Sequence, residues 1–138
     1  MTYALVRARY ADDTARTVSP GRLLTMLYDR LVSDLSAAED AMRRQDIADT
    51  GHRLGRAQEI LLELRSSLDT TAWPEGEALG QLYLWMVSEL MTARVRNEPK
   101  RVADCRALVE PLREAWRAAA LQTGAVSTEG PGLLGGAA

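Results

Sequence analysis

The chain has 138 residues, of which 46% are hydrophobic and 26% charged, and it contains no Phe. This composition is typical of one globular domain, whose core must consist of aliphatic side chains and a few large rings. Seventeen Lys and Arg residues against nineteen Asp and Glu residues leave a net charge of −2. That balance disfavours nucleic acid and anionic membranes as partners.

Cysteine and histidine are too scarce to build a disulfide framework or a metal site. Cys105 is the single cysteine and His52 the single histidine, which argues against a zinc site and a di-metal bundle site. Phosphate-binding signatures are absent. No signal peptide and no run of about 18 apolar residues is recognisable. We therefore expect a cytoplasmic protein without a metal, another cofactor, membrane insertion or enzymatic activity.

Apolar residues recur at every third or fourth position, which predicts an all-α fold. A first helix is expected to begin at Ser19 and Pro20, because Ser caps free amides and Pro suits the first turn. A second helix is expected from about Asp46 to Asp69. The apolar seams of these two helices are Leu24, Leu27, Tyr28, Leu31, Leu35, Ala38 and Met42, and then Ile47, Thr50, Leu54, Ala57, Leu61, Leu64 and Leu68.

Residues 70–76 are expected to form a turn, and residues 97–99 separate two further helices. Short connections predict an antiparallel up-down four-helix bundle over residues 19–121. Residues 1–18 are expected to form an N-terminal segment that covers part of the bundle, and the Gly-rich residues 122–138 a disordered tail. The two later seams are Leu79, Leu82, Tyr83, Met86, Leu90 and Ala93, and then Val102, Cys105, Val109, Leu112, Trp116 and Ala119.

The third expected helix carries more apolar surface than one bundle face can cover. Leu82–Val87 is apolar at six consecutive positions, so its side chains point in all directions around the helix. The cover is a further element of the same chain, a second copy of the protein or a partner peptide. The N-terminal segment, with Tyr10, is the candidate within the chain. A central helix of a plain, well-packed bundle is the alternative, and the pattern alone favours it.

Three smaller features have structural interpretations. Glu59 and Glu63 lie one helical turn apart, and neighbouring arginines favour surface charge pairing over acid–base chemistry. Gly51 and Gly55 have the spacing that allows another helix to approach closely. Pro111 predicts a kink in the fourth helix, because proline removes an amide donor and crowds the preceding turn.

Tyr10 precedes a distinctive stretch, Thr17-Val18-Ser19-Pro20-Gly21-Arg22-Leu23-Leu24-Thr25-Met26-Leu27-Tyr28-Asp29. This pattern resembles the signature of the flagellin-specific export chaperones, the FliS family. Later blocks at Leu82–Met86 and Leu112–Trp116 follow in the family's order, so the resemblance covers residues 10–120. The motif residues in this chain are Ser19, Pro20, Leu24, Leu27, Tyr28 and Asp29.

The resemblance implies a cytoplasmic helical-bundle chaperone that binds the C-terminal segment of flagellin and prevents premature polymerisation. It also implies delivery to the flagellar type III secretion apparatus, with the export gate as a further candidate partner, and no cofactor. We expect Tyr10 to act as an N-terminal plug of the flagellin-binding groove when flagellin is absent. The alternative is a helical regulator that binds another flagellar assembly or transcription factor. The expected groove residues are Leu62, Leu79, Tyr83, Met86, Val87 and Leu90.

Overall fold

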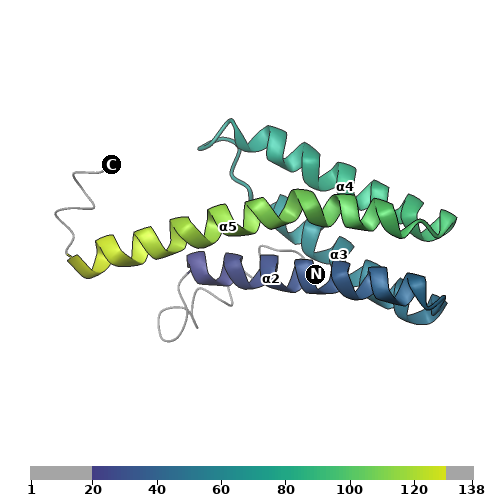
Figure 1. Ribbon diagram of the computed structural model, residues 1–138. Coiled ribbons are helices and arrows are strands. Elements are labelled where there is room, and N and C mark those ends of the chain that lie inside the picture. The colour runs from purple at the N-terminus through teal and green to yellow at the C-terminus, as the bar shows by residue number, and fades with distance from the viewer. Residues whose placement is uncertain (1–19, 130–138) are drawn as a thin grey trace.

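The computed structural model describes the backbone of residues 20–129 and the side chains of residues 21–122. Within this range the chain forms helices and no strand. The helices are α2 (Pro20–Arg43), α3 (Ile47–Ser67), α4 (Gly76–Arg96) and α5 (Pro99–Glu129), which Figure 1 shows in one bundle. The prediction of an all-α four-helix fold is confirmed.

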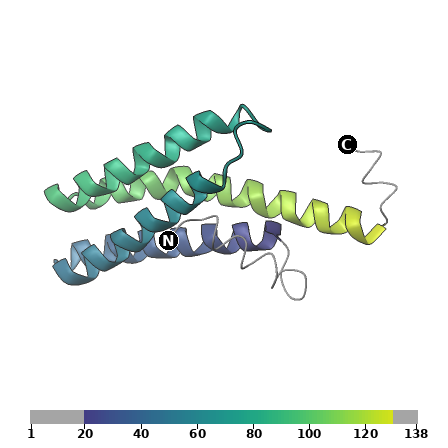
Figure 2. The same cartoon turned by 180° about the vertical axis from the view of Figure 1, so that it is seen from behind.

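Each helix packs against two neighbours, so the bundle is a closed ring. Helix α2 contacts α3 and α5, and α4 contacts the same two helices from the opposite side. Short connections make consecutive helices antiparallel, and Figure 1 shows that α5 extends past the first residues of α2. Figure 2 shows α3 and α4 from the other side. The bundle therefore has four seams between neighbouring helices.

Local capping explains the start of α3 and the end of α4. Asp46 caps α3 by accepting a hydrogen bond from the Asp49 amide at 3.0 Å, and Asn97 ends α4 in the left-handed region at φ 52°.

Helix α5 begins at Pro99 and runs through Pro111 to Glu129. The tail predicted over residues 122–138 thus starts inside this helix, whose backbone is described to Glu129. Residues 123–129 contain one Gly and no Pro, and the next proline comes only at residue 131.

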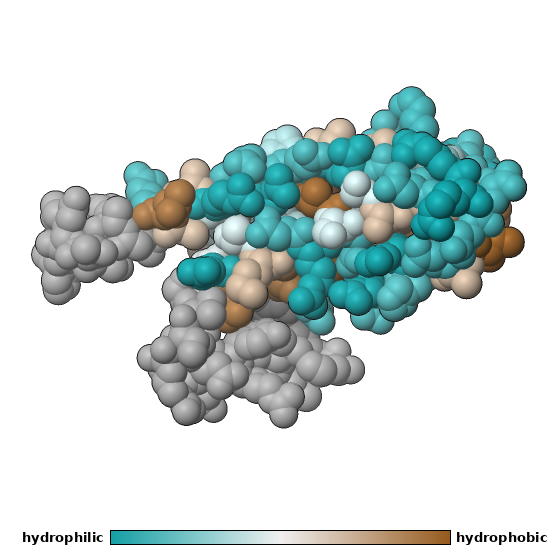
Figure 3. Space-filling view, turned by 60° about the horizontal axis from the view of Figure 1, so that its bottom comes forward, coloured by the Kyte–Doolittle hydropathy of each residue, from teal (hydrophilic) through white to brown (hydrophobic). Residues whose placement is uncertain are grey.

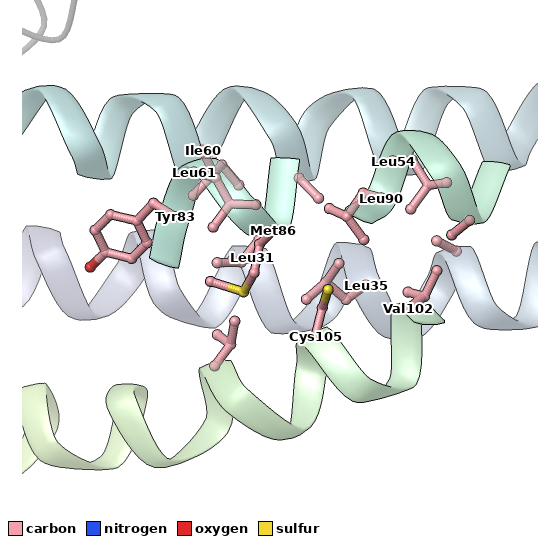
Figure 4. Packing of buried hydrophobic residues seen from close by; sticks show 14 of the residues in the cluster. Leu31, Leu35, Leu54, Ile60, Leu61, Tyr83, Met86, Leu90, Val102 and Cys105 are labelled. Carbon is pink, nitrogen blue, oxygen red and sulfur yellow. The ribbon is translucent and has the colours of Figure 1, made fainter. Parts of the chain in front are cut away.

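The core lies between the four helices and follows the predicted seams at most positions. Leu31, Leu35, Leu54 and their neighbours are buried, and Figure 4 shows them pointing toward one another from all four helices. Ile47 is the clearest exception, because this first residue of α3 lies beyond the end of the core and is 81% exposed. Burial, with smaller contributions from nearby carboxylates, raises the pKa of the Cys105 thiol to about 12.

Three aromatic side chains form a hydrogen-bonded group inside the bundle. Trp116 Nε1 donates to the Tyr28 hydroxyl at 3.2 Å, and the Tyr28 and Tyr83 hydroxyls form a hydrogen bond with each other. Burial raises the pKa of Tyr28, although the bonds to Tyr83 and Trp116 partly oppose this. A buried hydroxyl without a hydrogen-bond partner is costly. The three side chains satisfy one another and so connect α2, α4 and α5.

Candidate binding groove between helices α3 and α4

The seam between α2 and α5 is closed by ion pairs. Glu39 is buried and accepts hydrogen bonds from Arg106 Nε at 2.5 Å and Nη2 at 3.1 Å. The bond to Glu39 is the main reason why the pKa of Arg106 is raised. Asp29 pairs with Arg117 at 3.0 Å and with Arg113 at 3.8 Å. Charged side chains therefore cross this seam at two levels of the bundle.

Two further seams also carry charged contacts. Buried Asp34 of α2 lies 3.4 Å from Arg53 Nη1 and 3.6 Å from Arg56 Nε, both on α3. Arg101 of α5 reaches both oxygens of Glu89 on α4 at 3.2 and 3.1 Å. Arg56 thus pairs with another helix rather than with its acidic neighbours on α3.

The seam between α3 and α4 differs from the other three. No ion pair joins these two helices in the described part of the chain. A neutral hydrogen bond connects them instead, from Gln58 Nε2 to the Val87 carbonyl oxygen at 3.0 Å. Within the described residues, this seam is therefore held without charge pairing between its two helices.

Two glycines of α3, which carry no side chain, lie along this seam. A methyl group on Gly51 would lie 2.6 Å from Nη2 of Arg94, so this glycine makes room for an arginine of α4. A methyl group on Gly55 would meet no atom within 4 Å. The prediction of close helix approach thus fits Gly51, where an α4 side chain crosses α3, whereas Gly55 opens to the outside.

Apolar side chains border the two glycines on both helices. On α4 the spacing of Leu84, Val87, Met91 and Val95 places them on one face, and Met91 and Val95 are 51% and 77% exposed. On α3, Ile47 and Leu62 are exposed as well. We call this surface the α3–α4 groove, and its residues are Ile47, Gly51, Gly55, Leu62, Leu84, Val87, Met91 and Val95.

The groove opens into a hollow of about 650 Å³ at one end of the bundle. This end hollow lies beside the turns that connect α2 with α3 and α4 with α5. Figure 3 shows a hydrophobic patch at the same end of the molecule, on a face that is otherwise mostly hydrophilic. The lining residues of the end hollow are Gln45, Ile47, Thr50, Met91, Arg94, Val95 and Asn97.

The predicted groove residues divide between the groove and the core. Leu62 and Val87 lie in the α3–α4 groove, and Leu79 is partly buried against the core. Tyr83, Met86 and Leu90 are buried in the core, so they do not line the α3–α4 groove, and their role in flagellin binding stays a prediction. The apolar run in α4 contains an inner and an outer stripe, and these three belong to the inner stripe.

The sequence interpretation missed most of the outer stripe. It did not select Ile47, Met91 or Val95, although these are among the most exposed large apolar residues in the described range. The spacing of three, four and four residues from Leu84 to Val95 was the available signal. It runs parallel to the core stripe along α4, and only the packing shows which stripe faces outward.

The motif residues serve mainly to build the bundle. Tyr28 belongs to the core, Leu24 and Leu27 pack against it, and Asp29 forms surface ion pairs. Leu24 also lines a hollow of about 270 Å³ near the loop between α3 and α4, together with Trp73 and Trp116. Pro20 begins α2 as predicted. Ser19 and Tyr10 lie outside the described residues, so the plug role of Tyr10 stays a prediction.

Neither a metal cluster nor a membrane span is found in the described range. No group of three or more His, Cys, Asp or Glu side chains between residues 20 and 129 has the arrangement to hold a metal ion. None of the helices α2 to α5 combines the length and apolar content needed to cross a bilayer. His52 is exposed.

An exposed apolar seam between two helices of a bundle is the kind of surface that helix-in-groove recognition uses. The family model described as flagellar protein FliS matches residues 2–123. The chain therefore belongs to the FliS family, which confirms the resemblance seen in the sequence.

Individual relatives agree with this assignment. The flagellar secretion chaperone FliS of Escherichia coli is 32% identical over 108 residues, which cover 77% of this chain and 79% of the relative. Its counterpart in Vibrio cholerae is 29% identical over 106 residues, with 76% and 78% covered. The Bacillus subtilis protein of the same name is 27% identical over 110 residues, with 80% and 82% covered.

Proposed function

We propose that this chain is a cytoplasmic, non-enzymatic flagellar export chaperone that binds the C-terminal segment of flagellin in the α3–α4 groove. In this role it prevents premature polymerisation and aids delivery to the flagellar type III secretion apparatus. Membership of a family whose relatives are named flagellar secretion chaperones supports the role. We place the binding site in this groove because Ile47, Met91 and Val95 are exposed.

The shape of the groove suits an amphipathic helix. Apolar residues spaced by three and four positions on α4 present a continuous stripe, which is the surface that helix-in-groove recognition uses. The bare backbone at Gly55 lets a client helix approach more closely than larger side chains would. A segment that is unfolded when alone would fold on binding, and the apolar area it buries would offset the entropy it loses.

The chemistry of the groove also supports a binding cycle without a cofactor. Its surface consists of aliphatic side chains and glycine, with no catalytic group among the eight residues that define it. Binding of this kind is reversed by competition for the same client segment. We therefore propose that the flagellar export gate, or movement of flagellin into it, releases the client.

Calorimetric titration of the full chain with two forms of flagellin tests the proposal. Full-length flagellin should bind, and flagellin that lacks its C-terminal segment should show no measurable binding. Equal affinity for the two forms would contradict the proposed client segment. Binding to another flagellar assembly or transcription factor, with none to flagellin, would favour the regulator alternative.

A further inference from the structure

Arg94 has an unusual position in the end hollow. It lies on the last turn of α4, and its guanidinium crosses the backbone of α3 at Gly51. A methyl group on Gly51 would lie 2.6 Å from Nη2 and 2.9 Å from Cζ of Arg94. The guanidinium therefore occupies a place that only glycine leaves free, and it lies beside the apolar walls of the hollow.

Within residues 20–129, the Arg94 side chain forms no ion pair and no hydrogen bond. By contrast, Arg101 and Arg106 pair with carboxylates of neighbouring helices. The dipole of α4 stabilises a cation at this helix end, but it acts equally on Arg96 and does not explain why Arg94 lies in the hollow. An available guanidinium with apolar walls is suited to a carboxylate on an apolar chain.

The charges along the groove are arranged asymmetrically. Exposed acidic residues that form no ion pair in the described range lie toward the opposite end, on α3, on α4 and in the loop that connects them, with Arg65 as a cation among them. At the hollow end, by contrast, Asp46, Asp49 and Glu98 each pair with an arginine. A bound helix has a partial positive charge at its amino end and a partial negative charge at its carboxyl end. This arrangement of charges favours the direction of the client helix that places its carboxyl end at Arg94. The acidic residues are Glu59, Asp69, Glu75 and Glu77.

The geometry of the hollow indicates which carboxylate binds. Gln45 and Asn97, from the two turns at this end of the bundle, line the hollow where the groove stops. A helix that follows the groove therefore makes its last contacts with the bundle there. We propose that the client binds in one direction, with its carboxyl terminus in the end hollow and its terminal carboxylate paired with Arg94. This inference rests on the proposed function, because it assumes that the client is a C-terminal segment.

The test compares two synthetic forms of the flagellin C-terminal segment, one with a free carboxylate and one amidated. Calorimetry with the full chain should give about fivefold weaker binding for the amide, as expected for one half-solvated ion pair. Arg94→Gln should bind both forms equally, with the affinity of the amide. Arg96→Gln is the matched control, since Arg96 is exposed in the same helical turn but does not line the hollow, and it should keep the preference.

The other possible results of these titrations contradict either the inference or the proposed function. Equal binding of acid and amide by the unmodified chain would overturn the inference and leave the proposed function intact. If Arg94→Gln weakened both forms by the same factor, Arg94 would pair with an acidic side chain of the client, and the assigned direction would be wrong. Failure of both forms to bind would overturn the proposed function together with the inference.

Gly51→Ala provides a second variant that keeps the charge. Its methyl group would displace the guanidinium from its place on α3, so the preference for the free acid should fall below twofold. The variant should remain folded, because Ala favours helix more than Gly does. An unchanged preference in folded Gly51→Ala would show that the position of Arg94 on α3 does not contribute to binding.

Discussion

The seam between α2 and α5 and the seam between α3 and α4 are both formed by antiparallel helices, but their outer edges differ. Across the first, buried Glu39 pairs with Arg106, and the backbone at Gly21 lies close to Ala120. Across the second, Gly55 faces open space and Met91 is half exposed. The same helix packing thus produces one closed seam and one open seam.

The difference shows how a small bundle can combine stability with a free apolar surface. A buried carboxylate requires its partner, so the Glu39–Arg106 pair fixes the separation of α2 and α5. Glycine and aliphatic side chains impose no such requirement on the edge of the α3–α4 seam. That edge therefore stays exposed, as the proposed client site requires, while the inner stripe of α4 secures the fold.

The largest expected effect separates the two stripes of α4. Met86 lies in the inner stripe and is buried, so Met86→Ala should lower the free energy of unfolding by about 3–4 kcal/mol through lost burial and a cavity. Client affinity of the folded fraction should change by less than about twofold, a small change in binding free energy. Denaturant unfolding and calorimetry measure the two quantities. A folded variant of normal stability that fails to bind would place Met86 in the groove.

The next effect concerns the closed seam. Arg106→Ala should lower the free energy of unfolding by about 2–3 kcal/mol, because it leaves a buried carboxylate with only Arg43, 3.6 Å away. Arg117→Ala is the control, since its pair with Asp29 is exposed, and it should cost less than about 1 kcal/mol. Equal losses for the two variants in denaturant unfolding would show that the buried pair does not hold this seam.

A smaller effect compares glycines of the two seams. Gly55→Ala should raise the free energy of unfolding by about 0.5–1 kcal/mol, because Ala favours helix and the new methyl group meets no atom. Gly21→Ala should gain less, since its methyl group would lie 3.3 Å from Cβ of Ala120. Thermal unfolding measures both. Only Gly55→Ala should weaken client binding. An unchanged client affinity of Gly55→Ala would show that Gly55 does not contact the client.

The smallest effect depends on pH. Burial and the charge of Glu59 raise the pKa of Glu63 above its ordinary value of 4.5, and Arg30 partly opposes them. The folded chain therefore binds a proton at Glu63 more tightly than the unfolded chain does. This proton stabilises the fold below pH 4.5, and its contribution is lost as pH rises through the folded pKa of Glu63. Glu63→Gln should therefore raise the melting temperature slightly at pH 7. At pH 4 the gain should be smaller, and equal gains at both pH values would contradict this cause.

The sequence predicted the helices and most of the core because the apolar period and the turn residues act locally. It predicted the groove only in part, because Leu82–Val87 contains two stripes and only packing assigns the inner and the outer one. Ile47 continues the period of α3 but lies past the end of the core. The carboxyl-terminal end of α5 was placed too early, because the Gly-rich composition after residue 123 was given more weight than the absence of proline before residue 131.

The most direct test of the open groove compares two methionines of equal exposure. Met91 in the groove is 51% exposed and Met26 on α2 is 50% exposed, so Asp at either site makes the same chemical change. Calorimetry with the flagellin C-terminal segment should show at least about tenfold weaker binding for Met91→Asp, as expected for a lost apolar anchor. Met26→Asp should bind within about twofold of the unmodified chain, with similar melting temperatures for both variants. Unchanged binding by Met91→Asp, or equal weakening by the two substitutions, would contradict the account.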